Sequence, residues 1–525
     1  MAEFEKIDML GSSILVSLTT VLVSAISFLS QIVLAWRFGA TSGMDVYLVG
    51  ISMPMFVSGI FTAALSYSLV PALVNYQPGT DAFRKFAGAL FTGFFTAGIC
   101  ISIVGSALSP LQIKLLGESF SETQRFEALA VARISWLTSG LMLFAGYLRG
   151  LHNVKQQFFL STSSGLMPPL FIIYAGLTFS ESYGLIGIAW AMLVGVVLSI
   201  LLLLIHTYKD INLETINPIK NNEARQYFSH MPLIILSMLC FTTFQLVDSY
   251  WAPQIGTGNL SYLAYCQRLV VSIGNLVIAG PSLVVFPRLS KAHVDGYKDQ
   301  LLIDTIRLLR IVLACSLPIA ISIGILAEPF VILLFERGAF VRQDALNVAT
   351  LLPWMLLGMV PMLCVVMIFR VLFAQQDVVS AFALGALTTA LYFILSGLLI
   401  RQFGVIGIAI AYAGTWSIVF FIAIFRLCGS DLKQFAQLEN MLFARRIGLL
   451  MIFTGTVAVL GNYWLIYDNL SSSNLGIRLV VVGAMCFLTY CTLATRVIVL
   501  EEIRSILNYV YRKTVAILVS KKYKS

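Results

Sequence analysis

Hydrophobic residues fall along the chain in long blocks that are separated by short polar or turn-rich breaks. Most blocks run for about 20 residues or more, the length at which a helix crosses the ~30 Å hydrocarbon core of a bilayer. Window reading gives about fourteen blocks, with twelve as the lower bound. Their approximate ranges are 12–36, 44–75, 84–108, 126–151, 156–180, 183–208, 225–252, 260–287, 303–335, 344–374, 378–400, 403–427, 443–467 and 475–498. The pattern predicts an all-α, polytopic membrane protein with about 14 transmembrane helices.

Composition strengthens this prediction. Hydrophobic residues make up 59% of the 525 residues and charged residues only 11%, whereas soluble domains carry about 25% charged residues. The first eleven residues contain Glu3, Glu5 and Asp8 where a signal peptide would be basic, so we expect the first block to be retained. The eight cysteines have no metal spacing with the four histidines. No metal or cofactor is therefore predicted.

The positions of the basic residues indicate which partner the net charge of +9 faces. They gather at alternate ends of the predicted spans and in the tail, while the opposite loops carry few. This positive-inside asymmetry predicts that both the N- and the C-terminus lie in the cytoplasm. It also predicts that the basic residues face a membrane surface and do not bind nucleic acid. An even number of spans fits both termini on one side.

The chain also repeats itself. The segment YGLIGIAWA (183–191) matches FGVIGIAIA (403–411) at six of nine positions, at a spacing of 220, and FTAALSYSLVPAL (61–73) shares four positions with VIAGPSLVVFPRL (277–289) at a spacing of 216. We infer a duplication. One period holds six spans, so the prediction is two pseudo-symmetric six-helix lobes, residues 1–210 (N-lobe) and 211–430 (C-lobe). Two further spans follow in 431–500, then a basic amphipathic cytoplasmic tail in 501–525.

Motifs for an enzyme are missing from the sequence. It contains no G-x-x-x-x-G-K-[ST] loop, no H-E-x-x-H pair and no G-x-S-x-G elbow, and its acidic residues are scattered. Two parallel lobes of helices are typical of alternating-access transporters. The sequence therefore predicts a transporter that is not an enzyme.

Ionisable residues within the blocks are the candidate site residues. A charge in hydrocarbon costs ~3 kcal/mol or more unless it faces a cavity or a partner. The candidates are Arg268, Asp45 and Asp248, with Arg149 and Arg370 at matched positions of the repeat as secondary candidates.

Each candidate also has a structural interpretation. Arg149 and Arg370 could reach the headgroups with their long side chains. Asp45 opens its block, where an acid suits a helix N-terminus. Asp248 could form a structural salt bridge with Arg268.

Several segments resemble one family. They are RFGATSGMDVYLVGISMP (37–54), LVPALVNY (69–76), residues 247–292, LFERGAFVRQDA (334–345) and FRVLFAQQDVVSAF (369–382). Together they resemble the MurJ/MviN lipid flippases of the multidrug/oligosaccharidyl-lipid/polysaccharide exporter superfamily. The resemblance implies a monomer in the bacterial cytoplasmic (inner) membrane, acting beside cell-envelope biosynthesis enzymes.

The implied activity is flipping of a polyisoprenyl-pyrophosphate-linked saccharide, lipid II first among them, from the cytoplasmic to the outer leaflet. The resemblance also implies a cationic cavity for the pyrophosphate, a groove for the lipid tail in the last two helices, and coupling to membrane potential or to an H⁺ or Na⁺ gradient. No cofactor is implied.

The resemblance departs at the first-lobe arginines. Ser24, Ser30 and Gly59 stand where the family usually has arginine, while Asp45, Asp248 and Arg268 agree with it and Gln267 stands where some members have an acid. Two alternatives follow: a flippase for an O-antigen, capsule or exopolysaccharide unit, or a drug or cation antiporter of the same superfamily. A cation exporter has no use for a cavity arginine, so Arg268 favours a flippase.

Overall fold

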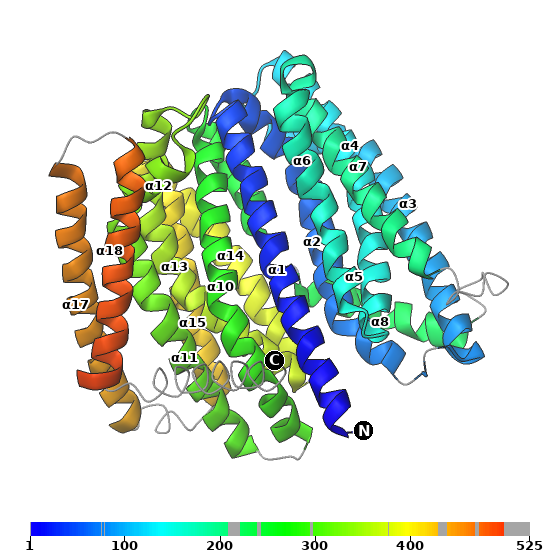
Figure 1. Ribbon diagram of the computed structural model, residues 1–525. Coiled ribbons are helices and arrows are strands. Elements are labelled where there is room, and N and C mark those ends of the chain that lie inside the picture. Colours follow the sequence, from blue (N-terminus) through cyan, green and yellow to red (C-terminus); the bar gives the residue numbers. More distant parts are fainter. Residues whose placement is uncertain are drawn as a thin grey trace, which may run out of the picture. The chain divides into compact units, whose positions relative to one another are not determined.

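The protein, seen in a computed structural model, is helical throughout the residues that the structure describes. These residues are 2–74, 76–77, 79–207, 221–238, 243–294, 298–375, 377–428, 438–467 and 472–497. The helices (Figure 1) are α1 (Ala2–Phe38), α2 (Ser42–Val74), α3 (Asp81–Leu116), α4 (Glu122–Val154), α5 (Phe158–Ser163), η1 (Ser164–Leu166), α6 (Met167–Thr178), α7 (Ser180–Thr207), α8 (Asn222–Met238), α9 (Thr243–Trp251), η5 (Ala252–Gln254), α10 (Asn259–Val294), α11 (Lys298–Ile325), α12 (Ala327–Phe335), α13 (Arg342–Ala374), α14 (Val378–Phe403), α15 (Val405–Cys428), α17 (Leu438–Tyr467), α18 (Ser472–Thr492) and η6 (Leu493–Val497). The all-α prediction is confirmed.

Twelve stretches of helix among these residues are long and apolar enough to cross a membrane. The two further predicted spans, 225–252 and 260–287, correspond to α8 with α9 and to α10. Residues that lie outside the description fall in or beside these helices. The twelve stretches and these two account for the fourteen predicted blocks.

Two predicted spans are interrupted helices. The block 303–335 is broken, because α11 ends at Ile325 and α12 begins at Ala327. Glu328 lies in the first turn of α12, where an acid interacts favourably with the helix dipole. The block 156–180 is built from α5, η1 and α6, and α6 has proline in its first turn, where the missing N–H costs nothing.

The chain forms two compact units. Unit 1 comprises Met1–Tyr265, Arg337–Asp344 and Gly385–Ile400, and unit 2 comprises Cys266–Glu336, Ala345–Leu384 and Arg401–Ser525. Unit 1 thus holds the first seven predicted spans together with the start of α10, the α12–α13 connection and part of α14. The lobe boundaries at residues 210 and 430 stay predictions. The predicted tail, 501–525, lies outside the described residues.

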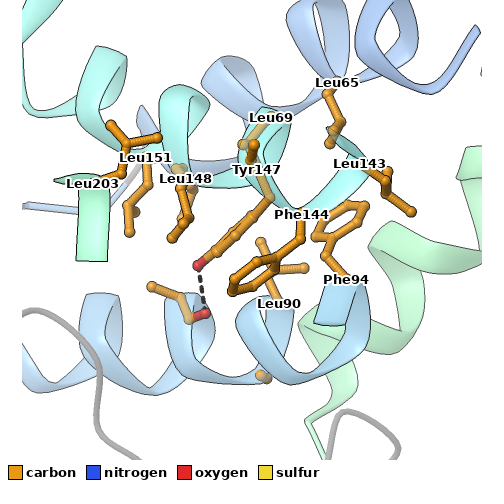
Figure 2. Close-up of a cluster of buried hydrophobic side chains, with 14 of the residues drawn as sticks. Leu65, Leu69, Leu90, Phe94, Leu143, Phe144, Tyr147, Leu148, Leu151 and Leu203 are labelled. Carbon is orange, nitrogen blue, oxygen red and sulfur yellow. Dashed lines mark hydrogen bonds between the residues drawn. The ribbon is translucent and has the colours of Figure 1, made fainter. Parts of the chain in front are cut away.

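The core of unit 1 lies between α2, α3, α4 and α7, which contact one another. Its large buried side chains (Figure 2) include Leu65, Leu69, Leu90, Phe94, Leu143, Phe144, Tyr147, Leu148, Leu151 and Leu203. The Tyr147 hydroxyl donates to the carbonyl of Ala87 at 2.7 Å, which satisfies the one polar atom of this ring in an apolar setting.

The backbones of α3 and α4 touch where two glycines meet. A Cβ atom on Gly98 would lie 2.5 Å from the carbonyl oxygen of Gly140. Small residues allow such close approach of membrane helices, whose packing is driven by van der Waals contact. The glycines therefore fix the distance between these two helices.

In unit 2, α17 and α18 pack against each other, and α17 packs against α11. Arg310 of α11 holds the start of α17: its Nε donates to Asn440 Oδ1 at 2.8 Å, and its guanidinium lies 3.6 Å from Glu439 and 5.8 Å from the centre of the Phe443 ring. Large apolar side chains such as Leu460 and Ile477 are exposed on this helix pair. They suit contact with lipid.

At the connection of α13 to α14, Asp377 caps the following helix. It accepts a hydrogen bond from the Ser380 amide at 3.1 Å and lies 3.5 Å from Arg426. Hydrogen bonds from Ser380, ahead of the charge of Arg426, lower the pKa of Asp377. The carboxylate form is therefore favoured at this turn.

One pair of repeat positions has matching backbone geometry. Gly184 and Gly404 both have positive φ angles, 53° and 59°. Gly184 marks a kink inside α7, and Gly404 separates α14 from α15. Glycine adopts this left-handed conformation without a steric penalty, which explains why both copies of the repeat carry it here.

Candidate functional site

Asp45 caps a helix other than its own. It lies in the first turn of α2, and its side chain is 2% exposed. Its Oδ1 accepts from the amide of Ser261 at 2.8 Å and from the Ser261 hydroxyl at 2.6 Å, while Oδ2 accepts from the amide of Gly258 at 2.5 Å. These amides lie at the start of α10, where helix N–H groups lack partners and the dipole is positive. The carboxylate thus joins the starts of α2 and α10.

Further bonds join the same end of unit 1. They run from the Tyr265 hydroxyl to the Gly39 carbonyl (3.0 Å), from the Ala339 amide to the Trp36 carbonyl (2.8 Å), and from the Tyr262 hydroxyl to Asp344 Oδ1 (3.0 Å). We call these residues, with Asp45, Gly258 and Ser261, the Asp45 cluster. It connects the end of α1, the start of α2, the start of α10 and the α12–α13 loop.

Gly39→Ala tests how tightly this cluster is built. Gly39 has a φ of 59°, and a Cβ there would lie 2.4 Å from the Ala339 carbonyl oxygen. We expect Gly39→Ala to lower the melting temperature of the purified protein, because left-handed strain costs roughly 1–2 kcal/mol and the clash adds to it. Gly184→Ala, with the same φ sign but open space, should lower it less. Gly448→Ala, exposed in α17 with no atom near, should not lower it. Equal effects of Gly39→Ala and Gly184→Ala would contradict close packing at the cluster.

Asp248 is the second buried acid of unit 1. Its side chain is 3% exposed and accepts a hydrogen bond from the Tyr392 hydroxyl. Between the same two helices, the Thr243 and Thr389 hydroxyls are 2.8 Å apart. These contacts tie α9 to α14. The predicted pairing with Arg268 stays untested, because Arg268 falls in unit 2.

Ser24, Ser30 and Gly59, which stand where the family usually has arginine, are uncharged residues within regular helix. The Ser24 hydroxyl donates to the Thr20 carbonyl at 2.9 Å and is exposed, while buried Ser30 donates to the Ser27 carbonyl at 2.7 Å. Gly59 is half-buried in α2. Each serine satisfies its hydroxyl within α1, so neither offers a substitute for a cation.

The arginine candidates are all half-buried in their helices. Arg149 of α4 donates from Nε to the Ser164 hydroxyl at 3.0 Å, so this edge of its guanidinium faces η1. Arg268 lies in α10 beside Gln267, and Arg370 lies near the end of α13. Arg268 and Arg370 belong to unit 2, and their contact with substrate stays a prediction.

Sequence reasoning missed the partners of both acids. A signal existed for Ser261: it follows Asp45 by 216 residues, the spacing of one repeat match, so the two occupy corresponding positions. No pattern singled out Tyr392, which lies inside an apolar block. Among the described residues, no group of three histidine, cysteine or acidic side chains could hold a metal ion.

The profile of the family described as "Lipid II flippase MurJ" matches residues 34–475. The chain belongs to this family. Curated relatives include a "Probable lipid II flippase MurJ" from Buchnera aphidicola subsp. Acyrthosiphon pisum, 24% identical over 78% of this chain and 81% of the relative. The "Lipid II flippase MurJ" of Burkholderia cenocepacia is 23% identical over 68% of this chain and 73% of the relative. Membership of the MurJ family confirms the prediction of a transporter rather than an enzyme.

Solved structures show the same fold. One described as "Lipid II flippase MurJ, inward closed conformation" has a TM-score of 0.73 at 20% identity, covering 92% of this chain and 99% of that one. An inward-facing multidrug resistance MATE family transporter of the MOP superfamily has a TM-score of 0.64 at 16% identity, covering 79% and 96%. The predicted polytopic MurJ fold is confirmed.

Proposed function

We propose that this MurJ family protein moves lipid II, a polyisoprenyl-pyrophosphate-linked saccharide, from the cytoplasmic to the outer leaflet of the bacterial inner membrane by alternating access. Family membership supports the substrate class. The observation that carries the mechanism is the Asp45 cluster, which joins helix ends of the predicted N-lobe and C-lobe within unit 1.

Alternating access needs contacts that close one end of the bundle and can be exchanged for water when that end opens. The Asp45 cluster suits this role because its contacts are hydrogen bonds between helix ends. With the N-terminus in the cytoplasm, as the basic residues predict, α1 ends at the outer face. The cluster then closes the outer face while the lipid enters from the cytoplasm.

The lipid is bound, in this proposal, by its charge and by its tail. Arg268, assisted by Gln267, holds the pyrophosphate, because a guanidinium stays charged and matches phosphate oxygens with paired N–H donors. Arg149 and Arg370 are secondary contacts. The tail lies along α17 and α18, and the membrane potential or an H⁺ or Na⁺ gradient biases the exchange of conformations.

A second candidate is a lipid-linked O-antigen, capsule or exopolysaccharide unit. It is favoured by Ser24, Ser30 and Gly59, which leave the first lobe without the arginines that the resemblance implies. A substrate held mainly by the C-lobe would then carry a different glycan on the same pyrophosphate.

Depletion of the protein in its own bacterium tests the choice. We expect lipid II to accumulate on the cytoplasmic leaflet and cell-wall synthesis to fail, measured by accessibility of lipid II to an externally added probe. Re-expression from a plasmid should reverse both effects. Normal peptidoglycan with loss of a surface polymer would contradict lipid II as the cargo and support the second candidate.

A further inference from the structure

Pro54 leaves a polar atom of α2 without its usual partner. Proline has no N–H, so a proline inside a helix removes the hydrogen bond to the carbonyl four residues earlier, and its ring crowds that carbonyl. Pro54 lies inside α2, and the carbonyl concerned is that of Gly50. In a membrane an unsatisfied carbonyl costs several kcal/mol, so another donor is required.

Gln112 of α3 supplies that donor. Its side chain is 2% exposed, and its Nε2 lies 3.0 Å from the Gly50 carbonyl oxygen and 3.0 Å from that of Val49. Its Oε1 accepts from the Trp136 indole N–H at 3.0 Å. The amide is therefore oriented by α4 and bound to α2. Gly50 itself abuts α4, since a Cβ there would lie 2.8 Å from Val131.

At a second proline in unit 1, the freed carbonyl finds its hydrogen-bond donor within the same helix. Pro110 lies inside α3 and frees the carbonyl of Ser106. The hydroxyl of Ser109 in the same helix donates to that carbonyl at 2.7 Å. A local donor of this kind repairs the helix but fixes it to nothing else.

A proline in unit 2 shows the neighbouring-helix arrangement again. Pro318 lies inside α11 and frees the carbonyl of Ala314, to which the Tyr490 hydroxyl of α18 donates at 2.6 Å. The pattern of a freed carbonyl and a donor from another helix thus occurs in each unit. Of α2, α3 and α11, only α2 carries a residue of the Asp45 cluster, Asp45 itself, in the segment before its proline.

We propose that Gln112 is a positioning residue for Asp45. A proline break lets the two parts of a helix bend relative to each other. By binding the Gly50 and Val49 carbonyls, Gln112 fixes residues 42–53 of α2 to α3 and α4. Asp45 then meets or leaves the start of α10 only as these three helices move together. This inference rests on the proposed alternating access but not on which lipid is carried.

A thiol-labelling experiment tests the proposal. The full-length protein, with its eight cysteines replaced, carries Leu260→Cys at the start of α10 and is placed in lipid nanodiscs without substrate. Leu260 is 2% exposed, so a water-soluble maleimide reports opening of the cluster. We expect Gln112→Leu to raise the labelling rate about tenfold, because a freed buried carbonyl loses its hydrogen bond. Adding Pro54→Ala restores an N–H at residue 54 that can donate to the Gly50 carbonyl, so it should restore the slow rate.

Trp136→Phe is the milder variant if Gln112→Leu does not fold. It keeps the amide of Gln112 but removes the bond that orients it, so we expect labelling to rise about threefold and Pro54→Ala to suppress the rise. If Pro54→Ala restores the slow labelling rate, Gln112 acts through the carbonyl that Pro54 frees. A general loss of packing would not be reversed by a substitution at residue 54.

Two matched variants should leave the labelling rate unchanged. Ser109→Ala removes the local donor beside Pro110, and Tyr490→Phe removes the equivalent donor beside Pro318. Wild-type labelling in both Gln112→Leu and Trp136→Phe, or a Pro54→Ala that restores neither, would overturn the proposal. So would an equal rise in Tyr490→Phe. A protein that carries another lipid would still give the expected labelling, so failure of the lipid II assignment is recognised separately, in the depletion experiment.

Discussion

Asp45→Asn should leave the protein in the membrane at its normal level but unable to replace a lipid II flippase in a complementation assay. The carboxylate accepts three hydrogen bonds from Gly258 and Ser261. An asparagine has one carbonyl oxygen, so its NH₂ group must face at least one of these donors. Each hydrogen bond to a charged group is worth about 1.5–3 kcal/mol. The closed state should therefore weaken by roughly tenfold to a hundredfold.

Ser261→Ala provides the graded comparison. It removes only the hydroxyl bond to Asp45 and keeps both amide bonds, so complementation should fall less than in Asp45→Asn. The Leu260→Cys labelling rate should rise in the same order. Full complementation by Asp45→Asn would show that the cluster does not serve transport, and a larger loss in Ser261→Ala would contradict the role of the backbone amides.

The sequence predicted the helices well because bilayer thickness sets a length that apolar blocks reveal. It did not predict the break between Ile325 and Ala327, since a window average over 303–335 stays apolar across a single interruption. The positive φ shared by Gly184 and Gly404 could be anticipated from the repeat, because a glycine kept in both copies indicates a backbone need.

The candidate site was predictable in residue type but not in partner. An acid at the start of a block indicates a helix N-terminus, and Asp45 does cap one, although the helix is α10 and not α2. The partner of a buried side chain depends on which helix ends meet in the fold, and residues 216 apart meet only through tertiary structure. Gln112 was missed for the same reason, because its role is to donate a hydrogen bond to the carbonyl that Pro54 frees on another helix.

Arg268→Ala should abolish flipping while expression stays unchanged. The residue is half-buried in α10, in a predicted span, where a cation is costly unless it faces a partner, a cavity or an anionic ligand. Removing a charge that grips a desolvated phosphate costs ~2–5 kcal/mol, so flipping should fall by on the order of a hundredfold or more. Lipid II transport into proteoliposomes of defined orientation measures this directly.

Two further substitutions serve as comparisons. One separates the charge of Arg268 from the planar geometry of its guanidinium, and the other tests whether losing any arginine impairs flipping. Arg268→Lys keeps the charge without the planar fork and should retain partial activity, because a single ammonium cannot make paired bonds to phosphate. Arg307→Ala removes an arginine of α11 whose side chain is 66% exposed and lies 3.7 Å from Asp304 one turn away, and an ion pair whose cation is this exposed contributes at most ~1 kcal/mol. Arg307→Ala should therefore transport normally. Wild-type flipping by Arg268→Ala would remove this guanidinium from the mechanism and leave the pyrophosphate to be held by other cations of unit 2.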